Sequence, residues 1–234
     1  MIIGISGRIG SGKDTVGKII QELIQYNKDQ SSEIKKFAGK LKETASILTG
    51  IPIEKFEDQE FKKTLLGSEW GTVKPNPLNA VPVFEDVQFN HLMSVREFLQ
   101  KLGTEAMREG LHKNVWVNAL FADYKKEGGS EGGERVASDG GYYSAPSYKG
   151  EYPNWIITDM RFPNEMKSVV ERNGITICVI RDYALRGNPE DPKNIHPSET
   201  SLDDAKFDYE IINDGTIEDL ERKVKEILVK EKLI

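Results

Sequence analysis

The chain has 234 residues, of which 38% are hydrophobic and 30% charged, and its formal net charge is −6 at pH 7. This length is enough for one large domain or two small ones, each with a core of its own. The single cysteine, Cys178, excludes an internal disulfide framework and a cysteine-based zinc site. The negative net charge argues against a general nucleic-acid binder, which usually carries a basic face.

No segment approaches the roughly 20 consecutive apolar residues that a membrane-spanning helix needs. The N-terminal residues lack the basic region, the long apolar run and the small-residue cleavage site of a signal peptide. The sequence therefore predicts a cytoplasmic protein with no membrane partner.

Short apolar runs rich in β-branched residues predict strands, because a run of this length is typical of a strand buried in a parallel sheet. Five such runs lie at residues 2–5, 33–37, 155–158, 175–180 and 209–212.

Apolar residues at helical spacing predict helices over residues 16–24, 94–102 and 216–228. Ser94 and Thr216 are the expected N-caps of the second and third helix. Because strands alternate with helices, we expect an α/β fold in which helices cover both faces of a mostly parallel sheet.

Two stretches depart from this alternation. Residues 125–153 contain three glycine pairs among Tyr, Ser and Pro, which predicts a mobile surface insertion with too few apolar residues for a core. Residues 183–205 are rich in Pro, Asn and Asp and predict a long loop or lid. No linker divides the chain into two independent cores.

A phosphate-binding loop is predicted at residues 7–15, where GRIGSGKDT follows the first strand with the Walker A spacing G-x-x-x-x-G-K. Glycines let backbone N–H groups wrap an anion, and the N-terminus of the next helix adds positive charge. A lysine at this position supplies a charge for the β- and γ-phosphates. A glycine turn without a ligand is the alternative, which the order of strand, loop and helix disfavours. The expected ATP-binding residues of this loop are Gly7, Gly10, Ser11, Gly12, Lys13, Asp14 and Thr15.

The residue after the lysine departs from the Walker pattern, which has a Ser or Thr there to bind Mg²⁺. Asp14 occupies this position, and Thr15 follows it. Either Asp14 carries the metal, directly or through water, or Thr15 substitutes for the usual hydroxyl. Asp14 is also simply a residue that is favoured in a first helical turn.

Asp159 and Arg161 follow the predicted strand at residues 155–158. Ligands of doubly wound sheets bind at the carboxyl ends of the strands. We therefore expect Asp159 to organise Mg²⁺ through water and Arg161 to hold a phosphate, with a local surface ion pair as the alternative. This pair favours a small kinase over a large ATPase motor, which would carry an acidic cluster after the strand. A GTPase is disfavoured because no guanine-reading Asn-Lys-x-Asp motif follows a strand.

Four blocks of the sequence resemble the phage-type deoxynucleoside monophosphate kinases, a branch of the P-loop nucleoside monophosphate kinases. They lie within residues 6–15, 96–117, 156–165 and 196–216. The phosphate loop alone indicates only a class of protein. The second block, with REFLQKLGTE, and the third, with TDMRFPNE, are more specific. The resemblance weakens over residues 50–93 and in the glycine-rich insertion.

This resemblance implies a three-layer α/β/α P-loop NTPase fold with about five parallel strands and with acceptor-binding and lid insertions. We expect one kinase domain, in which residues 38–93 form the insertion on the acceptor side. The core would consist of residues 1–37, 94–124, 154–182 and 206–234.

The resemblance also implies the reaction, which is ATP-dependent phosphorylation of deoxynucleoside 5′-monophosphates to diphosphates. ATP, Mg²⁺ and a nucleoside monophosphate are then the expected cofactors and partners, without a nucleic-acid polymer, while a homodimer stays open. One alternative is a P-loop kinase for another small phosphorylated acceptor, of the dephospho-coenzyme A or phosphomevalonate type. Another is a nucleotide-binding regulator without turnover.

By the same resemblance, functional residues are expected beyond the loop. The catalytic residues would be Lys13, Arg161 and Arg186, and the loop beside the donor adenine would contribute Asn213 and Gly215. The acceptor-binding residues would be Lys40, Arg96, Gln100, Thr104 and Arg108. The lid would contribute Arg181, Arg186 and His196, and the metal ligands would come from Asp14, Thr15 and Asp159. For Arg96 and Gln100, which share a helix face, a solvated polar surface is an equal alternative.

Overall fold

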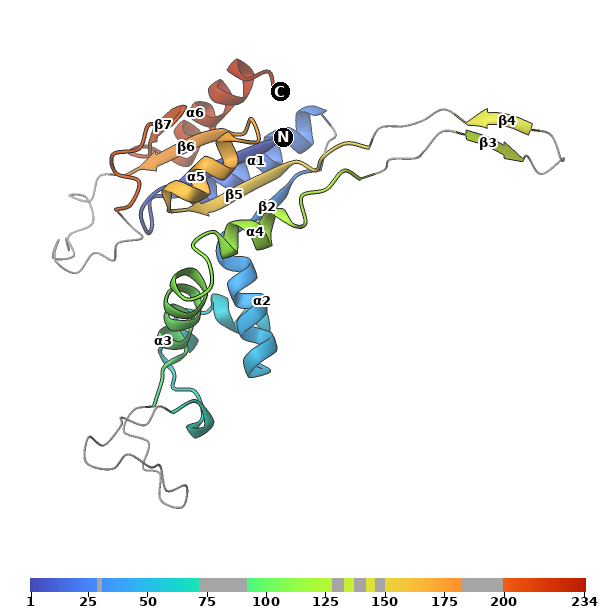
Figure 1. Cartoon of the computed structure of the whole chain (residues 1–234). Helices are drawn as coiled ribbons and strands as arrows, with labels where there is room; N and C mark the ends of the chain where they lie inside the picture. The colour runs from blue at the N-terminus through green and yellow to red at the C-terminus, as the bar shows by residue number, and fades with distance from the viewer. Residues whose placement is uncertain (29–30, 72–91, 128–132, 137–141, 146–149, 182–199) are drawn as a thin grey trace, which may run out of the picture. The chain divides into compact units, whose positions relative to one another are not determined.

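A computed structural model of the chain describes residues 1–28, 31–71, 92–127, 133–136, 142–145, 150–181 and 200–234 (Figure 1). The chain divides into two compact units. The first contains Met1–Phe37 and Val117–Ile234, and the second contains Ala38–Trp116. Residues 94–116, which the sequence analysis assigns to the core, therefore cluster with the acceptor-side insertion.

The first unit is an α/β sandwich. Its sheet consists of β1 (Ile2–Ser6), β2 (Glu33–Lys35), β5 (Trp155–Met160), β6 (Ile175–Ile180) and β7 (Tyr209–Ile212). Its helices are α1 (Lys13–Lys28), α5 (Pro163–Val170) and α6 (Ile217–Lys230), together with most of α4 (Val115–Phe121).

The five strands pair in the order β2-β5-β1-β6-β7, and every neighbouring pair is parallel. All five strands predicted from the sequence are present, and the P-loop α/β fold is confirmed. Because β1 lies in the middle of the sheet, the loop that follows it emerges between the ends of β5 and β6.

Alternate residues of the strands face two separate apolar cores. Ile3 and Ile5 of β1 pack with Val16 and Ile20 of α1 and with the apolar face of α6. Each apolar side chain buried in this way contributes roughly 1.5–3 kcal/mol to folding. The two helices α1 and α6 thereby cover the face of the sheet toward which Ile3 and Ile5 point.

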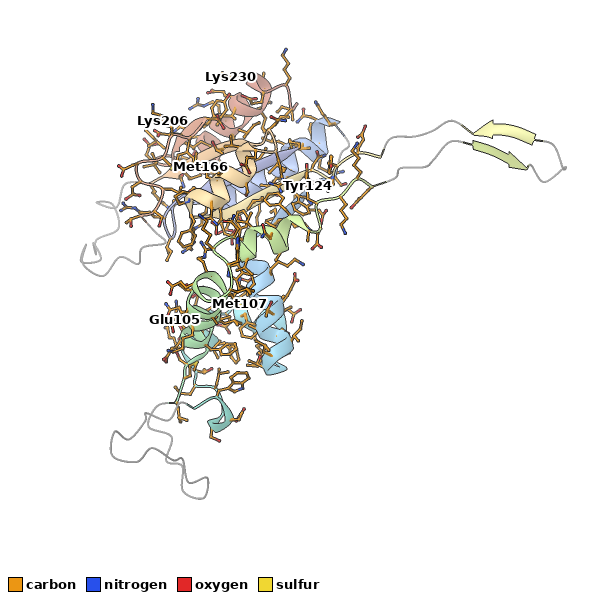
Figure 2. All side chains as sticks on the ribbon, viewed as in Figure 1. Glu105, Met107, Tyr124, Met166, Lys206 and Lys230 are labelled. Atoms are coloured by element: carbon orange, nitrogen blue, oxygen red, sulfur yellow. The ribbon has the colours of Figure 1, made fainter. Side chains whose placement is uncertain are left out.

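The opposite sheet face carries an aromatic core against α4 and α5. Ile2, Trp155 and Ile157 point into it, and Met166 of α5 packs on its border (Figure 2). Tyr124 lies against the Trp155 ring with 4.8 Å between ring centroids. The sheet is therefore covered on both faces, as the alternation of strands and helices predicts.

The second unit is helical. Its elements are α2 (Phe37–Thr49, of which Phe37 belongs to the first unit), the 3-10 turns η1 (Ile53–Glu57), η2 (Phe61–Lys63) and η3 (Ser68–Trp70), α3 (Val95–Gln100) and η4 (Lys101–Glu109). They enclose a small core whose buried residues are Ala45, Phe56, Leu66, Met93, Val95 and Phe98.

The predicted N-caps Ser94 and Thr216 are both confirmed. The Ser94 hydroxyl accepts a hydrogen bond from the Glu97 amide at 3.2 Å, and the Thr216 hydroxyl accepts one from the Asp219 amide at 3.3 Å. The helix that begins after Ser94 does not stay α-helical, because it continues as the π-helical segment η4. No helix among the described residues is both long and apolar enough to cross a membrane.

The glycine-rich insertion contains a hairpin that the sequence analysis does not predict. Strands β3 (Gly133–Val136) and β4 (Tyr142–Ala145) pair antiparallel. Nearer the core, Glu127 and Glu151 exchange both backbone hydrogen bonds, at 2.9 and 3.0 Å. The two ends of the insertion are thus joined by the backbone hydrogen bonds between Glu127 and Glu151.

We predict that residues 128–150 can be replaced by Asn-Gly without loss of the core fold. The Glu127–Glu151 pair has the geometry that flanks a two-residue hairpin turn, for which Asn-Gly is favoured. The melting temperature of the shortened chain should stay within about 3 °C of the full chain, because none of the residues described as forming the two apolar cores of the first unit lies in this stretch. A fall of more than about 8 °C would show that the insertion stabilises the core.

Candidate active site

The phosphate loop connects β1 to α1 with a backbone that requires glycine. Gly7, Gly10 and Gly12 have φ angles of 155°, 70° and 98°, which other residues rarely adopt. A Cβ atom on Gly7 would also lie 2.6 Å from the carbonyl oxygen of Val179. Lys13 opens α1, and only 7% of it is exposed.

One polar atom of this loop is buried without a partner. The Ser11 hydroxyl has no hydrogen bond within the described part of the chain, although only 2% of the residue is exposed. Buried hydroxyl groups are usually hydrogen-bonded, and a phosphate oxygen in the loop would satisfy this one. This orphan hydroxyl therefore fits the donor site that the Walker spacing predicts.

The Asp14 carboxylate is held by one group from β5 and by another from the residue that follows β2. Its Oδ1 atom accepts a hydrogen bond from the Thr158 hydroxyl at 3.0 Å and lies 3.2 Å from the Lys36 ammonium. Burial alone would raise the pKa of Asp14, but the charge and hydrogen bond of Lys36 and the hydrogen bond from Thr158 outweigh it, so the pKa is lowered.

Lys36 is a site residue that sequence reasoning missed. It follows β2, and its contact with Asp14 depends on the strand order β2-β5-β1, which places Thr158 of β5 between the two. Lys35 ends the short strand β2 and Lys36 follows it, and nothing in the sequence distinguishes a lysine that contacts the loop from one that is only solvated.

Asp159 and Arg161 lie where the sequence analysis expects them, at the carboxyl end of β5. The Asp159 Oδ1 atom accepts a hydrogen bond from the Phe37 amide at 2.8 Å, so this carboxylate also fixes the exit of β2. The backbone amide of Arg161 donates to the Glu165 carboxylate at 2.8 Å. Glu165 is only 2% exposed and holds the turn that carries Arg161.

Two further contacts reach the loop from the last third of the chain. Arg8 forms an ion pair with Asp203 at 2.7 Å. The side-chain amide of Asn213, which follows β7, donates to the Ser11 carbonyl oxygen at 2.7 Å. Gly215 lies in the same turn, against the Asp219 side chain.

The residues around the loop fit a Mg²⁺ ion bound chiefly through nucleotide. No cluster of three His, Cys, Asp or Glu side chains that could hold a metal occurs among the described residues. Mg²⁺ typically uses one or two carboxylates, phosphate oxygens and water. Asp14, which is exposed, and Asp159 can supply such carboxylates, with the half-buried Thr15 beside them.

The expected acceptor residues all belong to the second unit. Arg96, Gln100 and Thr104 are exposed, and Arg108 is half-buried. The Arg96 guanidinium donates to the Gln59 side chain at 3.1 Å. Lys40 lies 2.8 Å from Glu43 in an ion pair.

Gly103, in the same block, makes close packing possible within the second unit. A Cβ atom there would lie 2.8 Å from Leu41 of α2. The Gly103 carbonyl oxygen accepts a hydrogen bond from the Trp116 indole at 2.9 Å. Of the lid residues, Arg181 is exposed at the end of β6, whereas Arg186, His196 and most of residues 183–205 lie outside the described residues.

Comparisons with known proteins converge on one family. The model of the family described as deoxynucleotide monophosphate kinase matches residues 67–224, which is more than half of the chain. The deoxynucleoside-5′-monophosphate kinase of Escherichia phage T5 is 24% identical, over 91% of this chain and 89% of that protein.

A second phage protein and one solved structure are also similar to this chain. The deoxynucleotide monophosphate kinase of Escherichia phage RB69 is 27% identical, over 59% of this chain and 46% of that protein. A shikimate kinase from Aquifex aeolicus vf5 has a TM-score of 0.44 and 11% identity, over 100% of this chain and 99% of that chain. The assignment of the fold follows from the strand order and the phosphate loop, not from this weak likeness.

We predict that Cys178 of β6 is inert as a nucleophile. Burial, followed by the charges of Glu210 and Asp203, raises the pKa of its thiol to about 11. The neutral thiol therefore predominates below that pH, and alkylation by iodoacetamide at pH 8 should be at least about a hundredfold slower than for a free cysteine. The rate should rise about tenfold for each pH unit. Rapid labelling at pH 8 would contradict this prediction.

Proposed function

The chain belongs to the deoxynucleotide monophosphate kinase family, and on that premise we propose how its residues share the work of a deoxynucleoside monophosphate kinase. Such an enzyme passes the γ-phosphoryl group of ATP to the phosphate of a deoxynucleoside 5′-monophosphate and releases ADP and the diphosphate. The observation that carries the proposal is the strand–loop–helix phosphate site with Lys13 at its base.

Phosphoryl transfer requires two polyanions held in line while their charge is neutralised. We assign the donor phosphates to the loop glycines, the Ser11 hydroxyl and Lys13. Arg161, at the end of β5, would bind the transferred group, because a guanidinium can hold two phosphate oxygens at once. We also propose a catalytic role for Arg186, which rests on the sequence alone because this residue lies outside the described residues.

Mg²⁺, when bound, neutralises charge on the β- and γ-phosphates. We propose Asp14, Thr15 and Asp159 as the residues that hold it. Lys36 and Thr158 both contact the same carboxylate oxygen of Asp14 and so fix the direction of the other. The proposed role of Lys36 is to orient Asp14 and to offset its charge beside the polyphosphate.

The acceptor nucleotide is assigned to the second unit. Its candidate residues combine the positive charge that a phosphate needs with the hydrogen-bonding groups that a base edge needs. Arg96, Lys40 and Arg108 supply the charge, and Gln100 and Thr104 supply the polar groups. The family membership supports this assignment, since residues 67–224 include the whole helical block from Arg96 to Arg108.

We predict that Lys13→Ala lowers kcat at least about a hundredfold in a coupled ADP-release assay with Mg-ATP and a panel of dNMPs and NMPs. The substitution removes the charge that stabilises the migrating phosphoryl group. Lys18→Ala is a matched control, because this exposed lysine of α1 is outside the loop and should keep normal activity. A near-normal kcat for Lys13→Ala would refute the donor site. If no nucleotide of the panel supported ADP release by the wild-type protein, the substrate class would be refuted.

We also predict that Lys36→Met raises the Mg²⁺ concentration required for half-maximal activity several-fold and lowers kcat about tenfold. Lys36→Arg should restore both values, since it keeps the charge next to Asp14. Lys35→Met is the matched control, because Lys35 pairs with Glu33 and has no contact with Asp14. The melting temperature should change by less than about 2 °C, because partly exposed ion pairs add little stability. An unchanged Mg²⁺ dependence would contradict the assigned role.

A further inference from the structure

The turn between β7 and α6 contacts the phosphate loop through the side chain of Asn213. Its amide Nδ2 donates to the Ser11 carbonyl oxygen at 2.7 Å. Its own backbone amide donates to the carbonyl oxygen of Ile180 at 2.7 Å, which ties the residue to β6. Asn213 is therefore fixed at its backbone and extends its side chain to the loop.

This contact determines the direction of one peptide group of the loop. In a planar trans peptide the C=O and N–H bonds point in opposite directions, so the Gly12 N–H points away from Asn213. Backbone N–H groups of such loops bind the phosphates. Gly12 also permits the approach of Asn213, because a Cβ atom on Gly12 would lie 2.4 Å from Nδ2.

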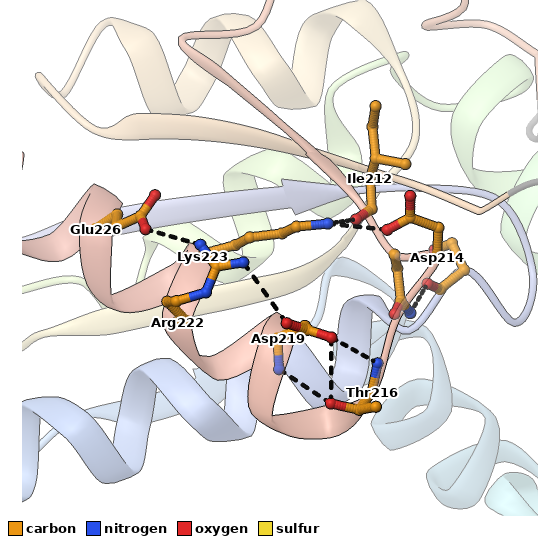
Figure 3. A network of polar contacts seen from close by, with 9 residues as sticks. Ile212, Asp214, Thr216, Asp219, Arg222, Lys223 and Glu226 are labelled. Carbon is orange, nitrogen blue, oxygen red and sulfur yellow. Dashed lines mark hydrogen bonds and ion pairs between the residues drawn. The ribbon is translucent and has the colours of Figure 1, made fainter.

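The turn that carries Asn213 is itself clamped from α6. The Lys223 ammonium donates to the Ile212 carbonyl oxygen at 2.6 Å and to the Asp214 carboxylate at 2.9 Å (Figure 3). These partners are the residues on either side of Asn213. Charge-assisted hydrogen bonds of this kind are about twice as strong as neutral ones.

The other end of the turn is fixed by the helix cap. The Thr216 amide and hydroxyl both lie within hydrogen-bonding distance of the Asp219 carboxylate, at 3.2 and 3.3 Å (Figure 3). Lys223 and Asp219 therefore hold the turn at both ends, and the side chain of Asn213 projects from a fixed backbone toward Ser11.

We propose that Asn213 is a positioning residue that holds the phosphate loop in its phosphate-binding conformation, and that Lys223 acts through it. This inference rests on the proposed function, because it takes the loop as the ATP site. It differs from the expectation that Asn213 contacts the donor base. A brace on the loop affects the polyphosphate that all nucleoside triphosphates share, whereas a base contact affects only the nucleoside.

The test compares the binding of ATP, GTP and inorganic tripolyphosphate by calorimetry in wild-type protein and Asn213→Ala. A brace predicts that all three dissociation constants rise by about tenfold, the order of magnitude expected when one partly buried hydrogen bond is lost and the Ser11 carbonyl oxygen is left without it. The ratio of ATP to GTP affinity should stay within about twofold. Weaker ATP binding with unchanged tripolyphosphate binding would instead establish a base contact and overturn the proposal, as would unchanged binding of all three.

A second set of variants tests the clamp without changing the loop or Asn213. Lys223→Met should weaken the binding of all three ligands about threefold, and Lys223→Arg should restore it. Lys225→Met is the matched control on the same helix, where the exposed lysine should be replaceable without effect. Equal losses in the Lys223 and Lys225 variants would refute the clamp.

Binding and turnover separate this inference from the proposed function. Protein that binds ATP and tripolyphosphate but transfers no phosphoryl group would refute the kinase assignment and leave the brace standing. Wild-type protein that binds neither ligand would refute both.

Discussion

The need to hold a glycine-rich loop in one conformation governs the arrangement of the first unit. Three glycines of the phosphate loop have positive φ angles, and glycine loses more conformational freedom on ordering than any other residue. The loop is therefore held by side chains from outside it. Thr158 and Lys36 contact Asp14, Asn213 contacts Ser11, and Asp203 pairs with Arg8. The contacting residues lie in or directly after β2, β5 and β7, or in the segment before β7. The parallel sheet therefore brings together the side chains that hold the loop.

Most of the sheet could be predicted from the sequence, because each strand is a local apolar run and each helix a local repeat. The contacts between Lys36 and Asp14 and between Asn213 and Ser11 could not. They join residues 22 and 202 positions apart, and the first of them depends on β5 inserting between β2 and β1. The family resemblance marks Asn213 as a site residue, but it does not indicate that its partner is the Ser11 carbonyl oxygen. The hairpin β3–β4 does not follow from the sequence, because the glycine pairs of this stretch have low strand propensity.

The second unit shows the same limit at a helix. Apolar spacing around Val95, Phe98 and Leu102 predicts a helix, but it does not distinguish the α-helical from the π-helical hydrogen-bond pattern. Just after η4, the amides of Gly110 and His112 donate to the carbonyl oxygens of Glu105 and Met107, which lie five residues earlier within it. Such segments are rare and are found at functional sites. Here the π-helical segment contains Thr104 and Arg108, two of the proposed acceptor residues. A helix that only faced solvent would not require this rare hydrogen-bond pattern.

The departure of Asp14 from the Walker pattern has an electrostatic consequence. A serine or threonine in this position brings no charge, whereas a carboxylate repels the polyphosphate of the donor unless a cation offsets it. In the proposed site Lys13 binds the donor phosphates and Mg²⁺, when bound, offsets part of the carboxylate charge, so a further cation beside Asp14 completes the offset. Lys36 meets this requirement at 3.2 Å, and Thr158 keeps the carboxylate oriented from between the two. The proposed pairing with Asp14 thus gives a role to a lysine that directly precedes α2 and that no sequence motif marks.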